Sequence, residues 1–152
     1  MRFKTIHEVL AWTGSFHQHL AEEYQRLSSG EPRERLRLLL QYLADHERAL
    51  QQALAAYCNG THDGALETWY DAAPDVPLPT PPGTLLEATQ ADAIMMLVQS
   101  ALTFHDTVIE LYSKLAAIAP NETIREIFEN LCALENHEKL RLVRATTAME
   151  DC

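Results

Sequence analysis

Apolar residues recur every three or four positions along four stretches of this 152-residue chain. That spacing predicts four long helices, each with one apolar face. The helices are expected from Thr5 to about residue 27, from Pro32 to about Tyr57, from Thr89 or Asp92 to about residue 119, and from about 122 to 150. Thr-x-x-Glu patterns predict capping boxes for the first helix, at Thr5 and Glu8, and for the fourth, at Thr123 and Glu126. Short breaks separate the first helix from the second and the third from the fourth, so each pair is predicted to form an antiparallel hairpin.

The segment between the two hairpins has a different composition. Five prolines lie between residues 74 and 82, and they favour extended chain over helix. About ten extended residues span roughly 30 Å, the length of a twenty-residue helix. This crossover is therefore predicted to return along the whole bundle, which makes the second and third helices parallel. Trp69 and Tyr70 are expected in a short helical turn on the outside of the bundle.

A repeat relates the two hairpins. The sequence FHQHLAEEYQRL, from Phe16, recurs 88 residues later as FHDTVIELYSKL, from Phe104. LADHERAL, from Leu43, is answered by LENHEKLR, from Leu134. We therefore expect one all-α domain, residues 1–152, built as a duplicated hairpin: residues 1–57, a crossover at 58–88, and residues 89–150.

Helical phase places several titratable residues on the apolar faces. The first and third helices each carry an inward histidine followed seven residues later by an inward tyrosine, and on the fourth helix a histidine lies about 120° from the apolar line. Buried imidazoles need either a carboxylate partner or a metal ion. The candidate metal ligands are His17, His46, Glu47, His105, Glu135, His137 and Glu138, with Tyr24 and Tyr112 beside them.

Together, the helix order and the repeat resemble the ferritin-like superfamily, nearest to its rubrerythrin-like and bacterioferritin-like members. The resemblance implies an up-down-down-up four-helix bundle. It also implies two iron or manganese ions, held by a glutamate from the first and third helices and Glu-x-x-His from the second and fourth. Here His17 and His105 replace the single glutamates, while Leu43, Leu134 and Leu50 occupy positions that the pattern would fill with ligands. An altered His/Glu site for iron, or for zinc or manganese, is therefore expected.

Three functions remain open at this point. The first is a metal-binding ferritin-like protein that handles iron or peroxide as an oxidoreductase; no catalytic residue is assigned. The second is a metal-free interaction or scaffold module in which His–Glu pairs fill the old cavity. The third is a bundle that binds a small organic ligand between Trp12, the tyrosines and Trp69.

Charge and composition narrow the partners. With 12 basic and 22 acidic residues the net charge is -10, which disfavours nucleic acid and anionic lipid. No apolar run is long enough to predict a membrane span. Three cysteines without a Cys-x-x-Cys pair predict free thiols and a cytoplasmic location. The third helix has an unusually wide apolar arc, including Phe104, Leu111 and Ile118, which predicts cover by the crossover or by a second subunit in a homodimer.

Overall fold

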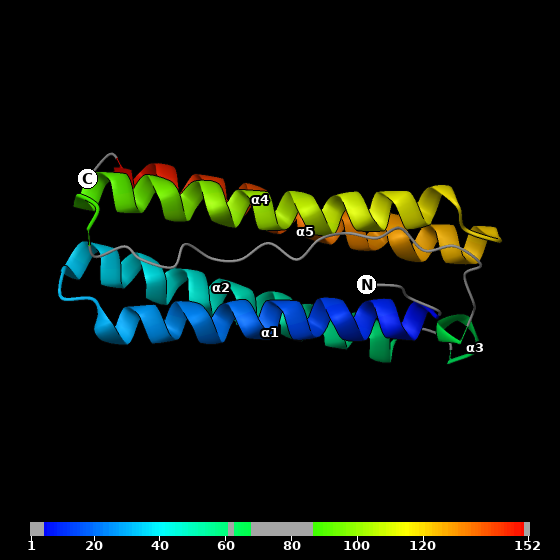
Figure 1. Cartoon of the computed structure of the whole chain (residues 1–152). Helices are drawn as coiled ribbons and strands as arrows, with labels where there is room; N and C mark the ends of the chain where they lie inside the picture. Colours follow the sequence, from blue (N-terminus) through cyan, green and yellow to red (C-terminus); the bar gives the residue numbers. More distant parts are fainter. Residues whose placement is uncertain (1–4, 61–62, 68–86, 151–152) are drawn as a thin grey trace.

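Four long helices form the body of the computed structural model (Figure 1), which describes residues 5–60, 63–67 and 87–150. Helix α1 spans Ile6–Gly30, α2 Glu34–Asn59, α4 Gln90–Ala117 and α5 Glu122–Glu150, and α3 is a single turn at Asp63–Leu66. The described residues contain no strand. The predicted all-α four-helix bundle is confirmed. Trp69, Tyr70 and the proline-rich part of the predicted crossover lie outside the described residues.

Threonine side chains begin α1 and α4. The hydroxyl of Thr5 accepts a hydrogen bond from the Glu8 amide at 3.2 Å, as the sequence predicted. The hydroxyl of Thr89 accepts from the Asp92 amide, also at 3.2 Å. Each bond satisfies one of the amides that has no partner in the first turn of a helix.

Helix α5 begins earlier than its predicted capping box. Asn121 Oδ1 accepts from the Ile124 amide at 3.0 Å, so Asn121 caps the helix and the prediction of a Thr123 cap is wrong. Asparagine caps at least as well as threonine. The chain therefore turns helical at Glu122, and Thr123 falls inside the first turn.

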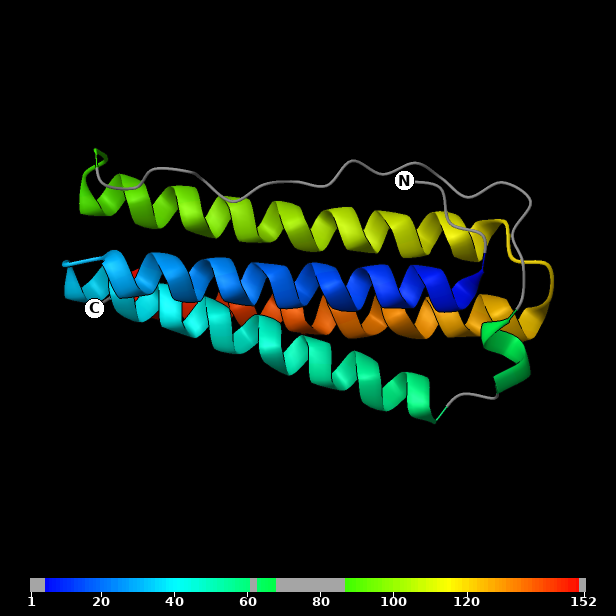
Figure 2. The same cartoon turned by 60° about the horizontal axis from the view of Figure 1, so that its bottom comes forward.

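The long helices pack as two hairpins, α1 with α2 and α4 with α5 (Figures 1 and 2). The hairpins approach one another closely through α2, which contacts both α4 and α5. An arginine also ties the α1–α2 loop to the residues before α4. Arg33 Nε donates to Glu31 Oε1 at 2.7 Å, and its Nη1 donates to the backbone oxygen of Ala88 at 2.7 Å.

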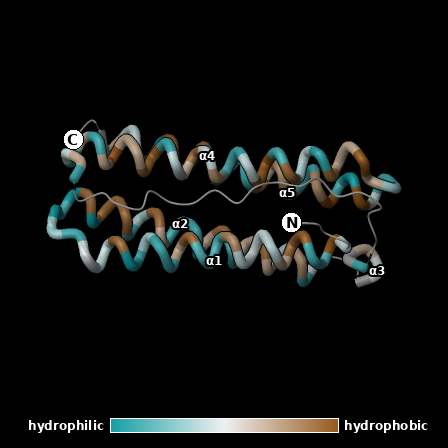
Figure 3. Tube along the Cα trace, in the orientation of Figure 1, coloured by the Kyte–Doolittle hydropathy of each residue, from teal (hydrophilic) through white to brown (hydrophobic). Residues whose placement is uncertain are grey.

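Apolar and polar residues alternate along every long helix (Figure 3), so each helix buries one face only. Within the described part of the chain, no helix has an apolar stretch long enough to cross a bilayer. The free thiols of Cys58 and Cys132 agree with the sequence prediction, and Cys152 lies outside the described residues.

The wide apolar arc of α4 divides into a buried and an exposed part. Phe104 and Leu111 are buried in the hydrophobic core of the single chain, so they need no second subunit to cover them. Ile118, one residue beyond the end of α4, is 49% exposed in the single chain, so its predicted cover by a second subunit is not tested. Met95 is 55% exposed near the other end of α4. The homodimer remains a prediction.

The repeat keeps one register throughout. Helix α2 begins at Glu34 and α5 at Glu122, the same 88-residue spacing that separates Phe16 from Phe104. Burial follows this spacing, as the pairs Leu36/Ile124, Leu39/Ile127, Leu40/Phe128, Leu43/Leu131 and Leu54/Leu142 are all buried. The 91-residue pairing of LADHERAL with LENHEKLR is therefore out of register by three residues. In the structural register, Glu47 corresponds to Glu135.

Candidate metal centre

A layer of titratable side chains crosses the apolar core. Its members come from all four long helices, and each is at most 9% exposed. Long polar side chains are rarely buried to this degree unless they are paired with one another or with a metal ion. The polar layer consists of His17 from α1, His46 and Glu47 from α2, His105 from α4, and Glu135 and Glu138 from α5.

His17 joins the two most deeply buried carboxylates. Its Nδ1–H donates to Glu47 Oε2 at 2.5 Å, and its Nε2–H donates to Glu135 Oε1 at 2.9 Å. Burial lowers the pKa of His17, but the hydrogen bonds and charges of Glu135 and Glu47 outweigh burial and raise it to about 10. His17 is therefore an imidazolium with both ring nitrogens occupied as donors.

Glu135 holds a second histidine with its other oxygen. His105 Nδ1–H donates to Glu135 Oε2 at 3.0 Å. Burial raises the pKa of Glu135, but the hydrogen bonds from His105 and His17 outweigh it and lower the value to about 2. Glu135 is therefore ionised, with one histidine on each oxygen.

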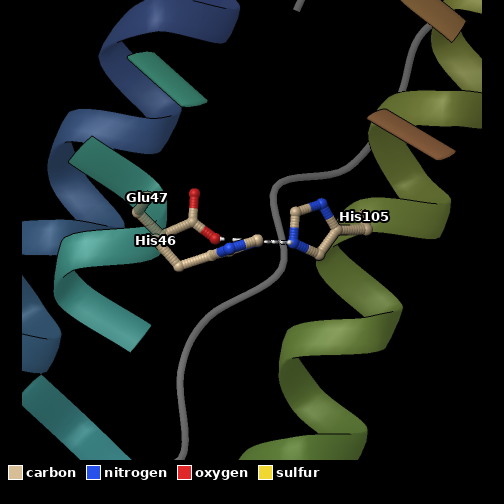
Figure 4. Close-up of side chains that lie close together, drawn as sticks. All are labelled: His46, Glu47 and His105. Carbon is tan, nitrogen blue, oxygen red and sulfur yellow. Dashed lines mark hydrogen bonds and ion pairs between the residues drawn. The ribbon is translucent and has the colours of Figure 1, made fainter. Parts of the chain in front are cut away.

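A cluster of potential metal donors lies on the far side of His105. His105 Nε2 faces His46 Nε2 at 3.2 Å, and Glu47 Oε1 lies 3.8 Å from His105 Nε2 (Figure 4). Because the Nδ1–H of His105 donates to Glu135, the Nε2 atom on the other side of the ring is the one that faces His46. His46, Glu47 and His105 each offer one donor atom, and these atoms lie within 4.8 Å of one another.

His46 occupies the more open side of the polar layer. Burial and the neighbouring His105 ring lower the pKa of His46, so it is neutral near pH 7. His46 Nδ1 is 3.8 Å from Glu138 Oε2, and Glu138 Oε1 accepts from Arg141 Nη1 at 3.3 Å. His46 and Glu138, at 8% and 9%, are the most exposed members of the layer, which places its solvent side between α2 and α5.

The residues fit a metal ion in donor type and spacing. A zinc or iron ion holds imidazole nitrogens at about 2.0–2.1 Å, so two such nitrogens lie roughly 3 Å apart. The Nε2 atoms of His46 and His105 already have that separation. Two imidazoles with one carboxylate suit iron, zinc or manganese. A carboxylate on the other nitrogen of a ligating histidine, as Glu135 provides for His105, fixes its tautomer and strengthens it as a ligand.

Tyr24 and Tyr112 point into the core, as predicted. Each is fully buried, and among the described residues neither hydroxyl has a hydrogen-bond partner. Burial raises the pKa of both phenols, and the nearby carboxylates Glu47 and Glu135 raise it further. The two hydroxyls are therefore neutral and unsatisfied beside the polar layer, which is costly in a low-dielectric core.

His137 does not join the layer. It is exposed on α5, and the prediction that it converges with the other histidines is wrong. The local likeness of LENHE to LADHE gave the wrong register. The decisive signal was the 30-residue separation of His17 and Glu47, which His105 and Glu135 repeat.

The sequence interpretation also missed Arg141. Its i,i+3 spacing from Glu138 was the available signal.

No protein-family model, curated protein or solved structure matches this chain.

Proposed function

We propose that this chain is a metal-binding protein of the ferritin-like type, with a transition-metal ion held by His46, Glu47 and His105. The observation that carries the proposal is the approach of two imidazole nitrogens, at 3.2 Å, in a buried cluster with a carboxylate. Two imidazole nitrogens that face one another in a core need either a proton shared in an N–H···N hydrogen bond or a metal ion between them. A metal ion satisfies both and offsets the charge of Glu47.

The arrangement of the helices supports the ferritin-like part of the proposal. In Figure 1 the first residues of α1 and the last residues of α4 lie at the same end of the bundle. That arrangement is expected of an up-down-down-up bundle in which a long crossover joins the second and third long helices. The family's four-glutamate cage is not reproduced, because histidines stand at 17 and 105.

Iron is the first candidate for the ion, and it would supply redox chemistry toward a small oxidant such as peroxide. The chain's own residues have separate tasks. His46 and His105 bind, Glu135 orients His105, and the leucines and phenylalanines around the layer exclude bulk water. We expect a small molecule to approach past His46 and Glu138, because these are the most exposed members of the layer.

A metal-free scaffold is the second candidate, and one observation favours it. His17 already satisfies one oxygen of Glu47 and one of Glu135 without any ion. In that case the polar layer would serve only to fix how the two hairpins pair. In this alternative the 3.2 Å contact between His46 and His105 is an N–H···N hydrogen bond between the two rings.

Metal analysis of protein purified without a nickel column tests the proposal. We expect bound iron, zinc or manganese, and we expect Fe(II), Zn(II) or Mn(II) added to chelator-treated protein to raise its melting temperature. An ion at 100 times its Kd stabilises the folded state by about 2.7 kcal/mol.

His46→Ala and His105→Ala should abolish the metal-induced rise in melting temperature. His137→Ala is the matched control, because it removes an exposed histidine from α5 and should leave the rise unchanged. Absence of bound metal, together with no rise for any of the three ions, would exclude the metal-binding function and favour the scaffold.

A further inference from the structure

The 88-residue repeat gives the polar layer two corresponding halves. His17 corresponds to His105, and Glu47 corresponds to Glu135. Each histidine Nδ1 contacts the carboxylate that lies 30 residues later, and each Nε2 faces the other carboxylate. Both carboxylates therefore lie between the two halves, which are named by their histidines, His17 and His105. A symmetric layer of this kind could offer equivalent ion sites in both halves, so the number of ions depends on the residues that break the repeat.

Two positions break it, and both add donors to the same half. His46 faces His105 at 3.2 Å, whereas the residue corresponding to His46 in the second hairpin is Leu134. Glu138 lies 3.8 Å from His46, whereas the residue corresponding to Glu138 in the first hairpin is the buried Leu50. The His17 half therefore has apolar side chains where the His105 half has an imidazole and a carboxylate.

His17 itself fills its half of the layer. Its two ring nitrogens contact Glu47 Oε2 at 2.5 Å and Glu135 Oε1 at 2.9 Å, so both nitrogens are already engaged by carboxylates. The other oxygens of the same carboxylates face His105, at 3.8 Å for Glu47 Oε1 and 3.0 Å for Glu135 Oε2. A cation on the His17 side would have to displace the His17 ring and would then find only these two carboxylates, without the extra donors of the other half.

We propose that the polar layer binds one metal ion per chain, in the His105 half, and that His17, Leu50 and Leu134 close the other half to a second ion. This inference rests on the proposed function and specifies the number and position of its ions. It departs from the two-ion centre that the ferritin-like resemblance implies. Three protein donors on a single ion leave coordination positions for water or a small exogenous ligand.

The test is the number of ions per chain. Chelator-treated protein is titrated anaerobically with Co(II), and separately with Fe(II), and the end point is followed by calorimetry and by the Co(II) visible spectrum. We expect a break at one equivalent, and one ion per chain by elemental analysis after desalting. Two ions per chain would overturn this inference while leaving the proposed function intact. No binding of either ion would overturn both.

Exchange of residues between the halves tests the position of the ion. His46→Leu gives the His105 half the leucine of its counterpart and should abolish binding, whereas Leu134→Ala, the control at the corresponding position, should still bind one ion. Retention of one full equivalent by His46→Leu would overturn the placement in the His105 half.

The reverse exchange, Leu50→Glu with Leu134→His, copies the extra donors into the His17 half and should add a second, weaker equivalent. A folded double variant that binds only one ion would overturn the role given to the two leucines. If circular dichroism shows that the double variant is unfolded, Leu134→His alone is used, since this position is partly exposed. The same outcomes then apply to the single variant.

Discussion

His17 and His105 occupy corresponding positions of a repeat and have different surroundings. His17 lies between two carboxylates and uses both ring nitrogens to hold them. His105 gives one nitrogen to Glu135 and turns the other toward His46. The difference arises in neighbouring residues rather than in the histidines themselves. In the His17 half, the histidine is therefore fully engaged by two carboxylates. In the His105 half, one imidazole nitrogen faces a second histidine and could bind a metal ion.

The largest expected effect is on the stability of the metal-free protein. His17→Leu leaves Glu47 and Glu135 each without one N–H donor in the core, and breaking a buried pair in this way costs about 3–5 kcal/mol. His105→Leu removes one donor from Glu135, which keeps its bond to His17, and should cost about 1–3 kcal/mol. Urea unfolding in the presence of a chelator measures both losses.

His137→Leu is the control for this comparison, because an exposed site should change stability by no more than about 0.5 kcal/mol. If His105→Leu lowers the free energy of unfolding by as much as His17→Leu or more, His17 is not the main partner of the two buried carboxylates.

Alkaline pH should weaken the metal-free protein through His17. An unfolded histidine titrates near pH 6.5, and the folded pKa of His17 is raised to about 10. The stabilisation is therefore complete below about pH 6.5 and is lost as the pH rises toward 10. Between pH 7 and 9 the free energy of unfolding should fall by roughly 3 kcal/mol, at about 1.4 kcal/mol per unit.

His17→Gln provides the reference for this pH series, since glutamine does not titrate. Its unfolding free energy should change much less between pH 7 and 9 than that of the unaltered chain. Parallel pH profiles for the two proteins would show that His17 is not the group responsible.

The start of α5 should depend on one side chain. Asn121→Ala removes the cap and should cost about 1 kcal/mol, whereas Thr123→Ala should cost no more than about 0.5 kcal/mol. The corresponding helix of the first hairpin, α2, has Arg33 at its N-cap position and no side-chain cap, so the two hairpins also differ here. Thermal unfolding monitored by circular dichroism compares the two variants. If Thr123→Ala lowers the stability more than Asn121→Ala, Thr123 is the cap, as the sequence predicted.

The smallest effect, of opposite sign, is expected at the tyrosines. Tyr24→Phe removes a buried hydroxyl that has no partner among the described residues, and it should raise the free energy of unfolding by about 0.5 kcal/mol. Tyr112→Phe should gain less, because the Thr13 hydroxyl lies beside Tyr112. The midpoints of urea unfolding, compared at equal m-values, give the change in the free energy of unfolding for both variants. A loss of stability in either variant would mean that ordered water or a ligand occupies the space next to that hydroxyl.

The four helices and the inward histidines of α1 and α4 could be predicted from sequence because both follow from apolar periodicity within a single helix. The register between α2 and α5 could not be predicted from local likeness. Three residues along a helix rotate a side chain by about 300°, so an alignment shifted by three keeps much of the inward face while exchanging Glu135 for Glu138.

Contacts between the hairpins were the other part that the sequence could not provide. Helical phase showed that His46 and His105 face inward, and nothing local indicates that their Nε2 atoms meet. That contact depends on how far α2 and α4 are offset along the bundle, which long-range packing sets. The same limitation applies to His17, whose bond to Glu135 joins residues 118 positions apart.

The unbroken 88-residue register has a consequence for how such a layer can arise. Two identical hairpins associating about a two-fold axis must present the same residue from each side, so every change in one copy appears in the other. A leucine at one position and a glutamate at its counterpart, as at Leu50 and Glu138, cannot exist in that assembly. Covalent fusion of the hairpins into one chain removes the constraint, because each side can then be altered alone.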